Sequence, residues 1–296
     1  MGALLAETKE ITDTSAAKMT EAADGKISVY NPLSFDRSGV IEFDGEIGIA
    51  GKPAQVYTDA DGNKKTAVQA IVPAMGALTF DVTEPAPAER VFKTFETEDG
   101  VLTTPFYKVK FDENGYISSL YDIRVNREVK RAGGASLGTL WLAEDMPTAY
   151  DNWEIEDDIF LKMQPVTELV SSEVVSDGAV EYRIRNTYKI GRATTAVVDT
   201  VFYAGDPRID YQMKIDWNER RHLLKAGFDV NIRAMTVKTK SSLVTWNVRR
   251  PETPLSKRRS SKSATTSGRI FPKTATAWRF STTASTVFPW TAPTCD

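Results

Sequence analysis

The stretch that decides the fold class of this chain is RIDYQMKIDW, residues 208–217. Polar or charged side chains alternate there with apolar ones, and the apolar set is Ile209, Tyr211, Met213, Ile215 and Trp217. Because successive side chains of a β-strand point to opposite faces, this pattern predicts an antiparallel strand with one face on a core and the other in water. Two further long runs alternate in the same way, VEYRIRNTYKI (180–190) and TTAVVDTVFYA (194–204).

Strand patterns also dominate the chain before these runs. In FYKVKFDENGYISSLYD (106–122), two alternating runs flank Asn114-Gly115. This pair tolerates the positive φ of a tight turn, so we predict a β-hairpin there. Residues 3–22 predict a helix, and EPAPAER (84–90) predicts a linker. The sequence therefore predicts a mainly β protein, in which a short N-terminal helix and a small β-domain precede a large β-sandwich.

Charge and cysteine content limit the cellular setting. Residues 252–296 carry seven Lys or Arg side chains against two acidic ones, a net charge of +5; since the whole chain carries −3, residues 1–251 carry −8. The single cysteine, Cys295, cannot form an internal disulfide, and neither a signal-peptide pattern nor a membrane-spanning run is present. We expect a cytoplasmic protein with no membrane or nucleic-acid partner, although basic Ser/Thr-rich tails can also be disordered nucleic-acid binders.

The densest group of carboxylates is AEDMPTAYDNWEIEDD, residues 143–158. Aromatic rings beside carboxylates suit a sugar site, because a ring stacks on the C–H face of a sugar and carboxylates accept bonds from its hydroxyl groups. We therefore take Tyr150, Asp151 and Trp153 as candidate substrate-binding residues. The alternative, which composition alone favours, is an acidic surface loop that carries one Trp into the core.

The sequence gives little support for a metal site or a catalytic nucleophile. The only histidine is His222, in NERRHLLK, so a His-rich zinc site cannot form within the chain. His222 could act as a base, but its setting favours a structural or surface role. Neither a Ser-His-Asp nor a Cys-His arrangement is supported, since Cys295 lies in the unusual tail. We therefore expect no catalytic residue, metal site or cofactor in this chain.

Four segments, in this order, resemble the C-terminal β-region of the α-mannosidases of glycoside hydrolase family 38, in particular the cytosolic and bacterial branch. They are VYNPLSFDRSGVIEF (29–43), ENGYISSLYDIRVNREVKRAG (113–133), PTAYDNWEIE (147–156) and DPRIDYQMKIDWNERRHLLKAGFDV (206–230). Each segment is weak alone, but their order and spacing fit over roughly residues 27–250.

The resemblance implies an architecture that extends beyond this chain. Family members have an N-terminal catalytic barrel with a zinc ion and a carboxylate nucleophile, then a helical bundle, then β-domains of which the largest resembles the galactose-mutarotase supersandwich. Zinc is thus implied for the full-length parent enzyme, which would cleave terminal α-mannosides with retention. The domain boundaries that follow are a helical remnant (1–25), a small β-domain (26–85), a large β-sandwich (91–251) and a tail (252–296).

Two functions from different classes stay open. The chain is either a fragment of an α-mannosidase that lacks the catalytic domain and is inactive alone, or a non-catalytic carbohydrate-binding or scaffolding β-sandwich module. An aldose epimerase is disfavoured, because epimerisation generally uses a His acid beside a carboxylate base, and the chain has a single histidine.

The tail, SSKSATTSGRIFPKTATAWRFSTTASTVFPWTAPTCD (260–296), is unlike the rest of the chain. Reading the last base of each codon with the first two of the next permits a stretch that resembles the missing family segment, HKWADLSEDGYGVALLNDCKYG. We therefore hypothesise that the chain is frame-shifted from about Glu252 and that residues 252–296 are disordered. The nucleotide sequence tests this: if the overlaps that follow the Thr265 and Thr266 codons do not encode His-Lys-Trp, the hypothesis is wrong.

Overall fold

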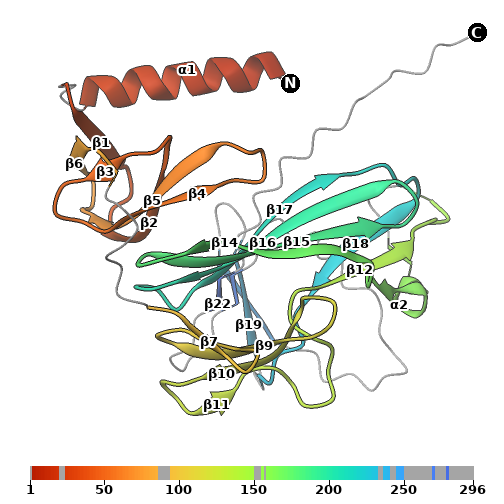
Figure 1. Cartoon of the computed structure of the whole chain (residues 1–296). Coiled ribbons are helices and arrows are strands. Elements are labelled where there is room, and N and C mark those ends of the chain that lie inside the picture. The colour runs from red at the N-terminus through yellow and green to blue at the C-terminus, as the bar shows by residue number, and fades with distance from the viewer. Residues whose placement is uncertain are drawn as a thin grey trace, which may run out of the picture. The chain divides into compact units, whose positions relative to one another are not determined.

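The computed structural model describes residues 2–19, 24–85, 94–149, 155–156, 158–232, 236–240, 245–249, 269–270 and 278–279. These residues are mainly in antiparallel β-sheets, with one long helix at the N-terminus, so the predicted fold class is confirmed (Figure 1). The chain forms two compact units. Unit 1 comprises residues 1–94, 175–182 and 203–206, and unit 2 comprises residues 95–174, 183–202 and 207–296.

Unit 1 contains the helix and two three-stranded sheets. The helix α1 (Gly2–Met19) begins one residue before the range predicted from residues 3–22 and ends within it, and its described side chains are exposed. One sheet has the order β1-β6-β3 and the other β2-β5-β4. The strands are β1 (Lys26–Asn31), β2 (Arg37–Asp44), β3 (Gly48–Ile49), β4 (Ala54–Thr58), β5 (Lys64–Val72) and β6 (Gly76–Thr83).

A small apolar core and a buried amide hold unit 1 together. Phe43 of β2 meets Phe80 of β6 edge-on, with ring centroids 5.7 Å apart, so the core joins the two sheets. Asn31, only 3% exposed, donates to the carbonyl oxygens of Phe35, Val72 and Pro73 and accepts a bond from Leu33 N–H. The segment NPLSFDR (31–37) is thus a turn anchored by its own first residue.

Unit 2 contains most of three further sheets, whose strands are between two and ten residues long. One sheet has the order β11-β10-β9-β8-β7, another β13-β12-β18 and a third β14-β15-β16-β17. These strands are β7 (Glu96–Glu98), β8 (Val101–Thr103), β9 (Tyr107–Phe111), β10 (Ile117–Asp122), β11 (Arg127–Glu128), β12 (Thr139–Glu144), β13 (Gln164–Pro165), β14 (Leu169–Asp177), β15 (Glu181–Ile190), β16 (Thr194–Tyr203), β17 (Ile209–Asp216) and β18 (His222–Gly227). A short helix, α2 (Ile159–Lys162), precedes β13.

Short ladders follow β18. β19 (Thr236–Lys240) pairs with β20 (Thr245–Arg249), and β21 (Arg269–Ile270) pairs with β22 (Trp278–Arg279). Of the tail 252–296, only β21 and β22 lie within the described residues, so the predictions of a frame shift and of disorder remain predictions.

The hairpin predicted around Asn114-Gly115 is present between β9 and β10. Asp112 organises the turn, since its Oδ1 accepts bonds from the N–H groups of Asn114 (3.0 Å) and Tyr116 (2.9 Å). Gly115 has φ +76°, and a Cβ added there would lie 2.6 Å from Nδ2 of Asn186. Glycine is therefore required at this position both by its backbone conformation and by lack of space.

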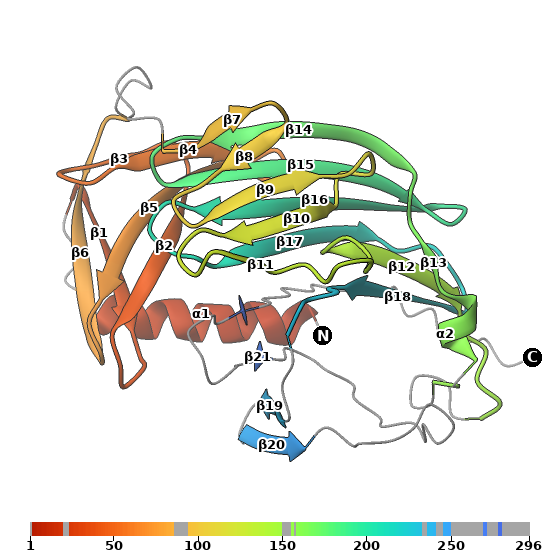
Figure 2. The same ribbon diagram turned by 90° about the horizontal axis from the view of Figure 1, so that it is seen from below.

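The core of unit 2 lies between sheets, which confirms a β-sandwich. The inward face of β15 and β16 packs on β12 and on the segment after β13; the buried members are Tyr116, Leu140, Val166, Tyr188, Ile190, Ala196 and Val198. Phe111 of β9 meets Phe202 of β16 with ring centroids 6.5 Å apart, so the β7–β11 sheet also packs here (Figure 2).

The opposite face of β15, β16 and β17 differs from the prediction of a solvated face. Arg183 is fully buried, and its guanidinium donates to Asp199 (3.2 Å) and to Gln212 (2.6 Å). Arg185 adds two bonds to the same carboxylate, at 2.7 and 2.8 Å. Asp210 is 8% exposed, whereas Lys214 and Asp216 further along β17 are exposed. Alternation correctly assigned these residues to one face, but that face is buried along the first half of β17.

We predict that Asp199→Ala destabilises the chain far more than Asp216→Ala. Removing the Asp199 carboxylate leaves two guanidinium groups without their shared buried partner, which lowers the free energy of unfolding by about 3–5 kcal/mol. The Asp216 side chain is exposed on β17, so its loss changes stability by about 0.5 kcal/mol or less. Urea unfolding followed by circular dichroism measures both, and equal midpoints for the two variants would contradict the prediction.

Candidate functional site

The sequence-predicted sugar site lies in the loop between β12 and α2. Its three candidate residues, Tyr150, Asp151 and Trp153, fall outside the described residues. The described flanks of the loop are fixed by hydrogen bonds: Thr148 N–H donates to Glu156 at 3.1 Å, and Lys162 forms an ion pair with Asp158 at 2.7 Å.

A groove of about 360 Å³ lies in unit 2, and its lining includes Glu144 at the end of β12 and Lys162 of α2. The ends of β12, β13, β15 and β18 line it together with α2. Figure 1 shows α2 beside β12, which it contacts. Leu142, Ala143, Pro165 and Val166 supply apolar lining, and the polar lining residues are Glu144, Lys162, Gln164, Thr167, Glu168, Lys189 and His222.

Two residues of the groove face each other across a strand pair. Glu144 is the last residue of β12 and His222 the first of β18, and the antiparallel register places them directly opposite. Side chains two residues apart on a strand share a face. Glu144 therefore lies on the same face as Leu140 and Leu142, and His222 on the same face as Leu224, all of which belong to or pack on the sandwich core. The pair lies where this face passes from the core to the surface, since Glu144 is exposed and His222 is half-buried.

The backbone fixes how the His222 ring is presented. Nδ1 lies 2.6 Å from the carbonyl oxygen of Arg220, which can only accept, so Nδ1 carries the proton and Nε2 remains as the second polar atom. Arg221 between them has φ +54°, a conformation uncommon for residues other than glycine. Its carbonyl oxygen accepts a bond from Asp145 N–H at 2.7 Å, which ties this strained residue to the end of β12.

Ion pairs balance most of the charge in the groove. Lys189 lies 3.3 Å from Glu168, and Lys162 pairs with Asp158. The hydrogen bond from Lys162 to Asp158 raises the pKa of Lys162, and the nearby carboxylates of Glu144 and Asp145 act in the same direction. Among the described residues, none forms a hydrogen bond or an ion pair with the Glu144 carboxylate. The Glu144 side chain is exposed, and its charge acts on Lys162 without a direct bond.

The β15–β16 turn forms another part of the wall. Glu219 accepts bonds from the N–H groups of Arg192 (2.6 Å) and Ala193 (2.9 Å), and these backbone bonds lower its pKa. Gly191, which lines the groove, has φ +60° and leaves no space for a Cβ beside the Glu219 carboxylate. The turn is therefore held in one shape by a side chain from the segment before β18.

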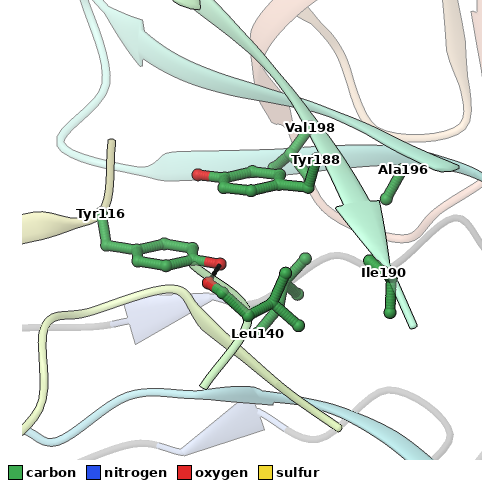
Figure 3. Packing of buried hydrophobic residues seen from close by; sticks show 7 residues of the cluster. Tyr116, Leu140, Tyr188, Ile190, Ala196 and Val198 are labelled. Atoms are coloured by element: carbon green, nitrogen blue, oxygen red, sulfur yellow. Dashed lines mark hydrogen bonds between the residues drawn. The ribbon is translucent and has the colours of Figure 1, made fainter. Parts of the chain in front are cut away.

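Two stacked tyrosines lie beneath the apolar lining. The rings of Tyr116 and Tyr188 are parallel within 4°, with centroids 5.2 Å apart (Figure 3). Tyr116 donates its hydroxyl proton to the carbonyl oxygen of Val166 at 2.7 Å, and Tyr188 donates to that of Asn114 at 2.8 Å. Burial raises the pKa of Tyr116 to about 12 and also raises that of Tyr188. The stack thus fixes Val166, one of the residues that form the apolar lining.

Sequence reasoning noted Glu144 and His222 separately but did not connect them. Glu144 was one of seven carboxylates in residues 143–158, and His222 was assigned a structural or surface role. In the sequence, each of these polar residues stands at the end of an apolar strand pattern. Only the register of β12 and β18 shows that they lie opposite each other.

No group of three or more His, Cys, Asp or Glu side chains suited to a metal ion occurs among the described residues. Zinc therefore has no set of ligands in this part of the chain. The described part also contains no helix with the length and apolar character needed to cross a membrane.

The layered sheets place the protein in the class of antiparallel β-sandwich proteins. Residues 102–274, more than half of the 296-residue chain, match the family model described as "Glycosyl hydrolases family 38 C-terminal domain". The chain belongs to this family, as the four sequence segments indicated.

Known relatives are much longer than this chain. "Alpha-mannosidase G" of Dictyostelium discoideum is 26% identical over 153 residues, which cover 50% of this chain and 14% of that protein. A glycosyl hydrolase family 38 protein from Enterococcus faecalis has a similar fold, with TM-score 0.53 and 12% identity, over 80% of this chain and 37% of its own. An α-mannosidase from Enterococcus faecalis V583 matches with TM-score 0.52 and 12% identity, over 82% and 36% respectively.

The tyrosine stack predicts a loss of stability at alkaline pH. A tyrosine whose pKa is raised by folding stabilises the protein fully below its unfolded pKa of about 10, and this contribution is lost as pH rises to about 12. Tyr116→Phe removes one such group together with the bond to Val166. We expect it to lower stability at neutral pH by about 1 kcal/mol and to reduce the alkaline loss.

Urea unfolding at a series of pH values between neutrality and about 12 measures this effect. Tyr121→Phe, at a half-buried position outside the core cluster, controls for the loss of a hydroxyl group. An alkaline profile of Tyr116→Phe that coincides with that of the unsubstituted chain contradicts the prediction.

Proposed function

We propose that this chain is the C-terminal β-region of an α-mannosidase that acts on terminal α-mannosides in mannose and oligosaccharide metabolism. The observation that carries this proposal is the family 38 match over residues 102–274. The name of the Dictyostelium relative and the two Enterococcus structures agree with it. The single cysteine, which cannot form a disulfide within the chain, supports a cytoplasmic setting.

In this proposal the chemistry belongs to a catalytic domain that precedes the β-region in the parent enzyme. Retaining glycoside hydrolysis needs one carboxylate as nucleophile and a second group that first donates and then accepts a proton. We place the nucleophile and the zinc ligands in that domain, because residues fit to hold the metal are missing from the described part of this chain. The β-region then supports the catalytic domain, its partner, and contributes to carbohydrate binding, and the chain alone does not hydrolyse mannosides.

We further propose that Tyr150, Asp151 and Trp153 contact the sugar. The support is chemical: an aromatic ring packs on the C–H face of a pyranose, and a carboxylate accepts bonds from its hydroxyl groups. Glu144, which precedes their loop, and Lys162 of α2, the helix that follows it, are lining residues of the groove.

The test uses the purified chain with added zinc and para-nitrophenyl α-mannoside. We expect no release of nitrophenol, and binding to immobilised α-mannose that Trp153→Ala weakens by about tenfold, the usual effect of losing a stacked aromatic anchor. Trp141→Phe, which keeps a ring on β12, is the matched control and should bind normally. Turnover that a chelator abolishes would show that the catalytic centre lies in this chain and would overturn the assignment of the chemistry.

A further inference from the structure

The groove in unit 2 is lined by a polar cross-strand pair, the exposed Glu144 and the half-buried His222. Glu144 and His222 stand opposite each other on faces whose preceding positions, Leu140, Leu142 and Leu224, belong to or pack on the core. The strained Arg221 and its bond to Asp145 fix the backbone beside the pair. Backbone strain of this kind persists only where its surroundings hold it in place, and it is often found at binding sites.

The charges in the groove favour a neutral ligand. The lining contains two carboxylates, Glu144 and Glu168, and two ammonium groups, those of Lys162 and Lys189, so these charges sum to zero. The lysines are each paired with a carboxylate, which leaves the Glu144 carboxylate and the His222 Nε2 atom as groups to which no described residue bonds. A carboxylate accepts bonds from hydroxyl groups, and an imidazole nitrogen can accept or donate one.

The size and lining of the groove further narrow the class of ligand that it can bind. A volume of about 360 Å³ lies at the lower end of the range for small-molecule sites. Leu142 is half-buried and Pro165 is exposed, and their apolar surface suits the C–H groups of a ring rather than a fully solvated ion. Since no aromatic residue is among the described lining residues, the apolar contact is small and the affinity should be weak.

We propose that the Glu144–His222 groove binds a single neutral pyranoside, with Glu144 accepting bonds from two adjacent hydroxyl groups and His222 bonding to a third oxygen. Carbohydrate binding in the β-region is part of the function proposed above, and the choice of an α-mannoside as the ligand rests on it. The groove itself is inferred from the cross-strand pair, the charge balance and the apolar lining.

The single histidine of the chain makes a direct test possible. In the ¹⁵N-labelled full chain, a long-range ¹H–¹⁵N spectrum contains side-chain signals from one imidazole, that of His222. Titration with methyl α-mannoside should move the Nε2 signal to saturation, with a Kd of about 1–10 mM. The backbone amide of Gly191, which also lines the groove, is a second reporter that survives substitution of His222.

Glu144→Gln removes the charge with little change of shape and should weaken binding by about tenfold. Glu98→Gln, an exposed glutamate of β7 in the same unit, is the matched control and should bind like the unsubstituted chain. His222→Gln should also weaken binding, measured from the shift of the Gly191 backbone amide signal. If Glu144→Gln does not fold, His222→Gln serves as the test variant. The proposal is wrong if no saturable shift occurs up to about 50 mM, or if both groove variants bind like the control.

Charged probes and a second sugar separate this inference from the proposed function. Methylammonium and acetate ions should cause no saturable shift, and tighter binding of either ion than of the sugar contradicts a neutral site. Methyl β-galactoside is titrated in parallel. Saturation by the galactoside alone would count against the α-mannosidase origin while the pyranoside groove stands, whereas saturation by neither sugar would count against the groove.

Discussion

The hydrogen bond from the Tyr116 hydroxyl to the Val166 carbonyl is the contact on which the arrangement of unit 2 most depends. Tyr116 lies at the end of the β9–β10 hairpin, and Val166 follows β13, so one bond joins two sheets. The ring of Tyr116 stacks on Tyr188 of β15. The Tyr188 hydroxyl donates a hydrogen bond to the carbonyl oxygen of Asn114 in the hairpin turn. Because a buried phenol must find a partner, these bonds determine which layers can meet and at what separation. The apolar lining of the groove follows from this arrangement.

The sequence predicted elements well wherever a local pattern determined them. The alternation in residues 208–217 identified β17, and Asn114-Gly115 identified the β9–β10 hairpin, because the backbone periods of strands and turns leave direct traces in the sequence. The same alternation did not reveal that the polar face around Arg183 and Asp199 is buried. Period-two patterns show which side chains share a face, but whether that face meets water depends on long-range contacts that leave no local pattern.

The candidate site illustrates the same limit. Glu144 and His222 were both visible in the sequence, and their pairing arises only from the register of two strands that are distant along the chain. The loop with Tyr150, Asp151 and Trp153 was found by composition, and it remains a proposal because these residues lie outside the described part. The family assignment succeeded for a different reason: four weak segments in a fixed order carry more information than any of them alone, and residues 102–274 match the family.

The hairpin between β9 and β10 also has a consequence for how this family can vary. Surface loops usually tolerate insertions, because only solvent surrounds them. Here the carbonyl groups of Asn114 and Gly115 accept bonds from Tyr188 and Asn186, and the next residue, Tyr116, holds the adjoining layer. Adding or removing one residue would displace all three bonds together. The length of this short loop is therefore under stronger structural constraint than the identity of its exposed side chains. Among related proteins, we expect the loop length to be retained longer than the exposed residues.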